Sequence, residues 1–291
     1  MNNNKSILKN FKLLSLIAVL LIVIGVAGAW LVGESGGSAI TLEETISVAN
    51  VDHVQIRTRN QRVRVHPTND SEAKVVSTGM PANATLTVEV INNVLTIETR
   101  VPRQIIVGVN FSSFRSLTDP PALAVYLPEN VYEQVTINST NGRVEVSGLA
   151  ITDLQIETTN GSIELNDIAG NVDVQTSNGR IRVSGITGDE ARFRTTNGGM
   201  ELADITNHIT GQTTNGRITF NHGTIEQNVD LQSTNGRIEV QLAREPEHAA
   251  FDLRTTNSRT EIFGNNNSTQ QFGDGRYEVT LRTTNGRITV E

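Results

Sequence analysis

One stretch of eight residues, Thr158-Thr159-Asn160-Gly161-Ser162-Ile163-Glu164-Leu165, recurs along the chain and sets its organisation. The first six copies are spaced by 18 to 20 residues. Such a period is typical of proteins in which each repeat stacks on its neighbours. The sequence therefore predicts one elongated domain of stacked copies. Their asparagines, which we expect to form a structural ladder, are Asn141, Asn160, Asn178, Asn197, Asn215, Asn235, Asn257 and Asn285.

Apolar and polar residues alternate on both sides of each Asn-Gly pair, as they do in β-strands. In one copy, Leu154 and Ile156 precede the pair on the inward side, and Ile163 and Leu165 follow it. Because Asn and Gly both tolerate φ > 0, we expect the pair to turn the chain at little strain. Each copy thus predicts a coil of two strands and two corners, with Ile168 as an inward plug at the second corner.

Two folds can be built from such copies. Asn-Gly between alternating strands is a strong hairpin signal, which would give an antiparallel meander or barrel. Position-by-position identity favours a parallel solenoid, because identical residues then stack about 4.8 Å apart in ladders. We therefore predict an all-β fold, a parallel β-solenoid (β-helix) with about 18–20 residues per coil and, from the crossover rule, right-handed coiling. The inward Ser or Thr two places before each Asn should form a ladder of hydroxyls.

The N-terminal part of the predicted solenoid is less regular. Asn60 stands in a degenerate copy of the repeat, so a first coil is expected there. Two alternating stretches on either side of Ile91-Asn92-Asn93 predict a β-hairpin. Residues 101–121 are apolar for a loop. We expect them to fold over the open end of the solenoid or to offer a hydrophobic contact site for a partner or membrane surface.

The N-terminus carries a membrane signal. Lys5, Lys9 and Lys12 precede an uncharged, mostly apolar run over residues 13–33, which is long enough to span the roughly 30 Å hydrocarbon core. The positive-inside rule then places the N-terminus in the cytoplasm and the bulk of the chain outside. We expect a single-pass bacterial membrane protein. The alternative is secretion after cleavage near Ala29.

Composition narrows the classes of function. The chain has no cysteine, so disulfides, thiolate metal sites and cysteine nucleophiles are excluded. Its net charge of -7 is spread along the sequence, which argues against a dedicated polyanion-binding protein. The expected division of the chain is a cytoplasmic basic segment 1–12, an anchor 13–33, a linker 34–43 and an extracytoplasmic solenoid 44–291, irregular over 44–134 and regular over 135–291.

The recurrent Thr-Thr-Asn-Gly-x-Ile carries a family resemblance, together with Val125-Tyr126-Leu127-Pro128 before the first regular coil and Gly273-Asp274-Gly275 before the last. In these motifs the chain resembles the bacterial putative-adhesin family of unknown function, which is built from β-strand repeats. More loosely, it resembles the head domains of autotransporter-type adhesins. The similarity covers about residues 44–291. It implies a single-span or secreted envelope protein with a β-helical outer domain, and it indicates no ligand.

Two charged stripes should run side by side on the outward side of the strand after the corner, one rich in arginine and one rich in glutamate. They could form an exposed face whose charges neutralise each other. Alternatively, the arginines could grip anionic envelope polymers or phosphate groups. The candidate surface-binding residues are Arg143, Arg180, Arg217, Arg237, Arg259 and Arg287 with Glu145, Glu164, Glu201, Glu239 and Glu261.

The stripes do not predict an enzyme. Glu145 with Glu164, or Glu239 with Glu261, should stack near the roughly 5 Å carboxyl separation of retaining glycosidases. However, a flat exposed strand offers nothing that would make one carboxyl a general acid. The histidines are scattered, and neither a metal nor a cofactor site is predicted. Nucleic acid is not expected, because interleaved carboxylates interrupt a phosphate track and outward aromatic residues are missing.

These features predict a non-enzymatic, membrane-anchored envelope protein, an adhesin that presents a repetitive solenoid face. Its partner would be an envelope polysaccharide, another cell or a protein. The alternative is a structural scaffold that self-associates end to end, because the last repeat is expected to form an uncapped final coil whose strand edges invite pairing.

Overall fold

The computed structural model describes residues 39–101 and 121–291. The regular structure of these residues is entirely β-strand, and none of it is a helix of the length and apolarity needed to cross a membrane. The predicted anchor at 13–33 lies outside the described residues, as does almost all of the apolar segment 101–121. The described residues belong to one compact unit, Ser38–Glu291.

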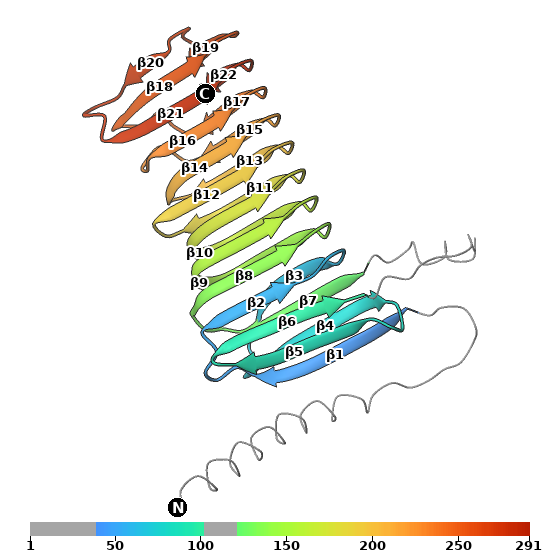
Figure 1. Cartoon of the computed structure of the whole chain (residues 1–291). Coiled ribbons are helices and arrows are strands. Elements are labelled where there is room, and N and C mark those ends of the chain that lie inside the picture. Colours follow the sequence, from blue (N-terminus) through green and yellow to red (C-terminus); the bar gives the residue numbers. More distant parts are fainter. Residues whose placement is uncertain (1–38, 102–120) are drawn as a thin grey trace, which may run out of the picture. The chain divides into compact units, whose positions relative to one another are not determined.

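The strands form two series, one on each side of the Asn-Gly corner (Figure 1). The first series leads into the corner and the second leaves it. In stacking order, the first series is β6 (Val94–Arg100), β2 (His53–Arg57), β8 (Tyr132–Ser139), the later parts of β9 (Val144–Thr158) and β10 (Ile163–Thr176), β12 (Glu190–Thr195), β14 (His208–Thr213), β16 (Val229–Ser233), β21 (Tyr277–Thr283) and β18 (Ala249–Thr255).

The second series stacks in the same order of coils. It consists of β7 (Ala122–Pro128), β3 (Arg62–Thr68), the early parts of β9 and β10, β11 (Ile181–Thr187), β13 (Met200–Ile205), β15 (Ile218–His222), β17 (Ile238–Leu242), β22 (Ile288–Val290) and β19 (Thr260–Ile262).

Neighbouring coils pair in parallel, with equivalent residues of the repeat side by side. Ile163 lies opposite Val144 in one neighbour and Ile181 in the other. The same register continues through Met200 to Ile218. The prediction of a mainly parallel all-β solenoid is confirmed, and the antiparallel meander is wrong for the repeats. Right-handed coiling stays a prediction.

The inward side chains of both series make a continuous apolar core. The apolar residues expected to face inward are 0 to 3% exposed, so each removes nearly all of its apolar area from water, at about 25 cal/mol per Å². They include Val135, Val144, Ile163, Val172, Ile181, Ala191, Met200, Ile209, Ile218, Val229, Ile238, Phe251 and Ile288.

The corner glycines are required by close stacking between coils. A Cβ atom on Gly179 would lie 1.8 Å from the carbonyl oxygen of Gly161 in the preceding coil. The described residues with positive φ lie outside the Asn-Gly pairs, so the prediction that φ explains the corner is wrong. The same close approach, at 1.6 to 1.9 Å, recurs at Gly142, Gly161, Gly198, Gly216, Gly236 and Gly286.

The last repeat of the sequence is not the last coil of the stack. In β21, Leu281 lies opposite Leu231 of β16 on one side and Leu253 of β18 on the other. β22 lies in the same way between β17 and β19 (Figure 1). β20 (Thr269–Gln271) then pairs antiparallel with β18. The expectation that the final repeat forms an uncapped end is therefore wrong, because the chain returns past the outer coil and inserts that repeat.

At the N-terminal end, too, the order of the coils in the stack differs from the order of the repeats in the sequence. Val54 of β2 lies between Leu95 of β6 and Val135 of β8, so the degenerate repeat at Asn60 forms an inner coil. Antiparallel strands are added to the outermost coil: β5 (Thr85–Ile91) pairs with β6, β4 (Glu72–Met80) pairs with β7, and β1 (Ile40–Ser47) pairs with β4.

The N-terminal end contains the expected hairpin but a shorter linker than expected. The hairpin is present as β5 and β6, and Asn92 and Asn93 have φ values of 50° and 65°, as a two-residue type I′ turn requires. The segment 34–43 was expected to be linker, but β1 begins at Ile40. Pairing with β4 orders Ile40 to Glu43, the last part of that segment.

We expect His222 to make the stability of the solenoid depend on pH. Its ring stacks on Phe220 with centroids 5.7 Å apart, and burial lowers its pKa, while Asp204 and Glu226 oppose that shift. The unfolded chain, with a His pKa of about 6.5, then takes up the proton more readily than the folded one. We expect the melting temperature to fall between pH 7.5 and 5.5, and to fall less in His222→Gln. Equal pH profiles for the two proteins would contradict this.

Candidate binding face

The outward side of the second series carries two columns of side chains. The first column directly follows the corner, and backbone hydrogen bonds fix its order: Val63 N–H donates to the Arg143 carbonyl, and Ile288 N–H donates to that of Arg259. In stacking order the column is Arg62, Arg143, Ser162, Arg180, Gly199, Arg217, Arg237, Arg287 and Arg259.

The second column lies two residues further along each strand. We call the two columns together the arginine face. In stacking order the second column is Arg64, Glu145, Glu164, Arg182, Glu201, Thr219, Glu239, Thr289 and Glu261.

The arginine face has an excess of positive charge. Its two columns hold nine arginines and five glutamates, although the whole chain has a net charge of -7. The two outward columns of the first series that lie three and five residues before the corner asparagine are balanced, with Arg57, Arg192, Arg194, Arg254 and Arg282 against Glu98, Glu157, Asp173, Asp230 and Asp252. The charges look evenly spread along the sequence, but folding sorts them onto different faces.

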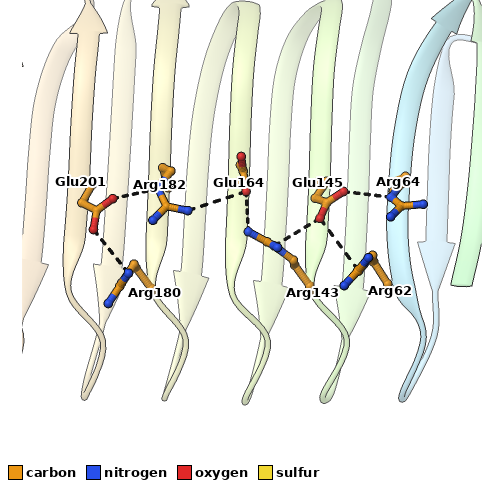
Figure 2. Close-up of polar contacts among 8 residues, drawn as sticks. All are labelled: Arg62, Arg64, Arg143, Glu145, Glu164, Arg180, Arg182 and Glu201. Carbon is orange, nitrogen blue, oxygen red and sulfur yellow. Dashed lines mark hydrogen bonds and ion pairs between the residues drawn. The ribbon is translucent and has the colours of Figure 1, made fainter. Parts of the chain in front are cut away.

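In the N-terminal half of the arginine face the charges are paired (Figure 2). Arg143 bridges Glu145 at 3.2 Å and Glu164 at 2.6 Å, and Arg64 contacts Glu145 at 3.0 Å. A hydrogen bond to Glu201 raises the pKa of Arg182. The other pairs are Arg62–Glu145 at 4.0 Å, Arg182–Glu164 at 3.9 Å, Arg182–Glu201 at 2.8 Å and Arg180–Glu201 at 3.5 Å.

The C-terminal half of the arginine face has fewer partners. Arg217 and Arg237 share one carboxylate, that of Glu239, at 4.0 and 3.2 Å. Their side chains are 56% and 55% exposed, compared with 38% for Arg143. Arg287 and Arg259 are exposed and make no ion pair with any residue in the described ranges. Of these four arginines, two thus share one carboxylate and two have no acidic partner within the described residues.

The glutamate pairs do not assemble a hydrolytic site. Thr289 lies between Glu239 and Glu261, so the expectation that these two glutamates stack is wrong. The cause is the insertion of β22. Glu145 and Glu164 do lie opposite each other, but both carboxylates are held by Arg143 on an open strand.

The corner asparagines form a ladder of side-chain hydrogen bonds. Each Nδ2 donates to the Oδ1 of the preceding coil over 2.6 to 2.8 Å. Because the amides bond to each other, this column serves the stack rather than a ligand. In stacking order the ladder is Asn60, Asn141, Asn160, Asn178, Asn197, Asn215, Asn235, Asn285 and Asn257.

The inward hydroxyls close the corner in a way that the sequence did not indicate. Thr176 Oγ1 donates to the Gly161 carbonyl of the preceding coil at 3.1 Å and accepts the N–H of Gly179 at 3.1 Å. In the repeats, these hydroxyls bond to backbone groups and not to one another. The same two bonds occur at Thr195, Thr213, Ser233 and Thr283.

One cluster of potential metal ligands occurs among the described residues. Oxygen or nitrogen atoms of Asp52, His53 and Glu133 lie within 4.8 Å of one another. His53 Nδ1 is 2.6 Å from Asp52 Oδ1, and this hydrogen bond is the main cause that lowers the pKa of Asp52. The two side chains satisfy each other, which accounts for the cluster without an ion.

A scan against protein-family models matches residues 51–291 to the Toastrack DUF4097 model. The chain belongs to the Toastrack DUF4097 family. The Toastrack match spans every repeat and both columns of the arginine face. It agrees with the resemblance that the repeats suggested. No curated protein matches the sequence.

Solved structures similar to this Toastrack domain share little sequence with it. A putative adhesin from Bacteroides fragilis has a TM-score of 0.47 at 12% identity, over 88% of this chain and 98% of that chain. A putative adhesin from Parabacteroides distasonis has a TM-score of 0.47 at 11% identity, over the same shares. A protein from Parabacteroides distasonis described as a putative lipid binding protein has a TM-score of 0.40 at 15% identity, over 88% and 98%.

Proposed function

We propose that the chain is a non-enzymatic adhesin of the bacterial envelope. A membrane span at residues 13–33 anchors it, with residues 1–12 in the cytoplasm and the solenoid outside. The arginine face binds an anionic partner of the envelope or of another cell. The observation that supports this most is the excess of arginine on one flat face of an otherwise acidic chain.

The chemistry of arginine suits such a surface. The guanidinium group stays charged at any physiological pH and presents a planar fork of donors to carboxylate or phosphate oxygens. A stacked column repeats that fork on successive coils at about 4.8 Å. Many weak contacts along a rod can then add to a useful affinity without an enclosed pocket.

Binding of residues 39–291 to envelopes isolated from the producing bacterium tests the proposal. We expect saturable binding at physiological ionic strength that weakens as salt is added, because exposed charges are screened. Absence of binding at 0.15 M salt would overturn the proposal. Exposure and anchoring have a separate readout: the solenoid should be cleaved by protease added to intact cells, and the uncleaved protein should stay in the membrane fraction.

A further inference from the structure

The C-terminal half of the arginine face contains the longest unbroken run of arginine in the stack. Ile218 N–H donates to the Arg237 carbonyl, Ile238 N–H to that of Arg287, and Ile288 N–H to that of Arg259. Arg217, Arg237, Arg287 and Arg259 therefore stand on successive coils, and we call them the C-terminal arginine row. Elsewhere the same column is interrupted by Ser162 and Gly199.

The second column offers this row two carboxylates, those of Glu239 and Glu261, for four guanidinium groups. Thr219 and Thr289 stand where other coils carry a charged side chain. Glu239 is the one carboxylate that contacts the row within the described residues. Exposed like charges about 5 Å apart repel one another, and an oxyanion placed between two guanidinium groups removes that repulsion. The row can thus bind a series of anions that are spaced regularly along the stack.

The row ends at an open polar hollow of about 660 Å³ on the outermost coil. Arg259 lines it, together with Arg254 from the first series. Arg254 is held by Asp252 through two hydrogen bonds, whereas Arg259 has no acidic partner in the described ranges. The remaining lining is mostly hydroxyl and amide, from Thr255, Ser258, Thr260, Asn266 and Ser268, with Leu253. Such groups suit the oxygen-rich end of a polar chain.

We propose that the C-terminal arginine row and the hollow at its end bind a linear polymer that carries one oxyanion, phosphate or carboxylate, per repeat unit. The inference rests on the proposed function and gives its ligand class and position. The polymer lies along the stack, across the strands, and each guanidinium fork holds one oxyanion. Single-stranded nucleic acid is a poorer ligand, because the row and the second column beside it offer no aromatic ring for base stacking.

The test compares two variants with equal loss of charge. The row variant changes Arg217, Arg237, Arg287 and Arg259 to Gln. The control variant changes Arg57, Arg192, Arg194 and Arg282 to Gln, on the balanced face of the first series. Residues 39–291 of each protein are titrated with long-chain polyphosphate, polygalacturonate, neutral dextran and single-stranded DNA at several salt concentrations. Melting temperatures check that both variants fold.

We expect the wild-type domain to bind one of the two polyanions, and the preferred one tells phosphate from carboxylate. The row variant should lose about 100-fold in affinity, and the slope of log affinity against log salt should fall by about 3, at roughly 0.7 per lost contact. The control variant should stay within about threefold of wild type. Equal losses in both variants, unchanged binding by the row variant, or tighter binding of DNA would each overturn the inference.

Failure of the inference is distinguishable from failure of the proposed function. If the wild-type domain binds isolated envelopes but neither polyanion, or if the row variant binds envelopes as wild type does, the row is not the site and the adhesin proposal survives. If the wild-type domain does not bind envelopes at all, the proposed function itself fails.

Discussion

We expect Gly179→Ala to lower the free energy of unfolding by at least about 3 kcal/mol, because the new methyl group has no room. It would lie 1.8 Å from the Gly161 carbonyl oxygen and 2.6 Å from the carbonyl carbon. Both are backbone atoms that hold neighbouring coils in register, so neither can move without separating the strands beside it. Urea denaturation of residues 39–291, followed by circular dichroism, measures the change.

Gly223→Ala is the matched control for this substitution. A Cβ atom on Gly223 meets nothing within 4 Å, and its φ is not positive. Its free energy of unfolding should stay within about 0.5 kcal/mol of wild type. If Gly179→Ala were tolerated as well as Gly223→Ala, coils would not approach as closely as described, and the corner glycines would need another explanation.

Thr176→Val should destabilise the domain by about 2 kcal/mol or more. The substitution keeps the shape of a side chain that is 2% exposed, but it leaves the Gly161 carbonyl and the Gly179 N–H without partners. An unsatisfied buried polar group costs about 1–3 kcal/mol. Thr176→Ser keeps the hydroxyl and should be much closer to wild type in the same denaturation experiment. A larger loss for Ser than for Val would show that packing, and not the hydroxyl, closes the corner.

The coil could be predicted from the sequence because every copy repeats the same spacing of inward residues. Ile163 and Ile181 occupy the same place in copies 18 residues apart, and the structure pairs them. The order of the outer coils could not be predicted in this way. The repeat at Asn285 fits between any two copies, so its sequence does not say which neighbours it has. The one signal was the long connection after Ile262, which is what allows the chain to return.

The sequence pattern also did not show why glycine is required at the corner. Glycine after Asn is equally compatible with positive φ and with close stacking, and only coordinates separate the two. Four of the positive φ angles lie instead within strands of the second series, at Gly148, Asp167, Gly185 and Asp204, with values of 67°, 55°, 72° and 50°. Because this position is Gly in some repeats and Asp in others, the sequence pattern does not mark it as a site of positive φ.

The sequence predicted the stripes of arginine and glutamate, but it did not predict that the arginine face carries an excess of positive charge. Alternation assigns Arg and Glu to the outward side, which the structure reproduces. Arg62 and Arg64 were not among the predicted site residues, because they belong to the degenerate repeat at Asn60. The spacing between Glu239 and Glu261 depends on the inserted coil. Which side chains are neighbours on the face depends on the order in which the coils stack. The sequence predicts that order only where each repeat stacks on the repeat that precedes it in the chain.

The central claim is that each repeat forms one coil of a parallel stack, with the last repeat inserted between the two before it. Disulfide formation tests this directly, since the chain has no cysteine of its own. Gln232 lies opposite Arg282, and Arg282 lies opposite Arg254. The Cα atoms of a disulfide lie about 4.4–6.8 Å apart, a range that includes adjacent strands at about 4.8 Å and excludes strands two coils apart. Under mild oxidation, Gln232→Cys with Arg282→Cys should cross-link, and Gln232→Cys with Arg254→Cys should not. The reverse result would contradict the stacking order and, with it, the C-terminal arginine row.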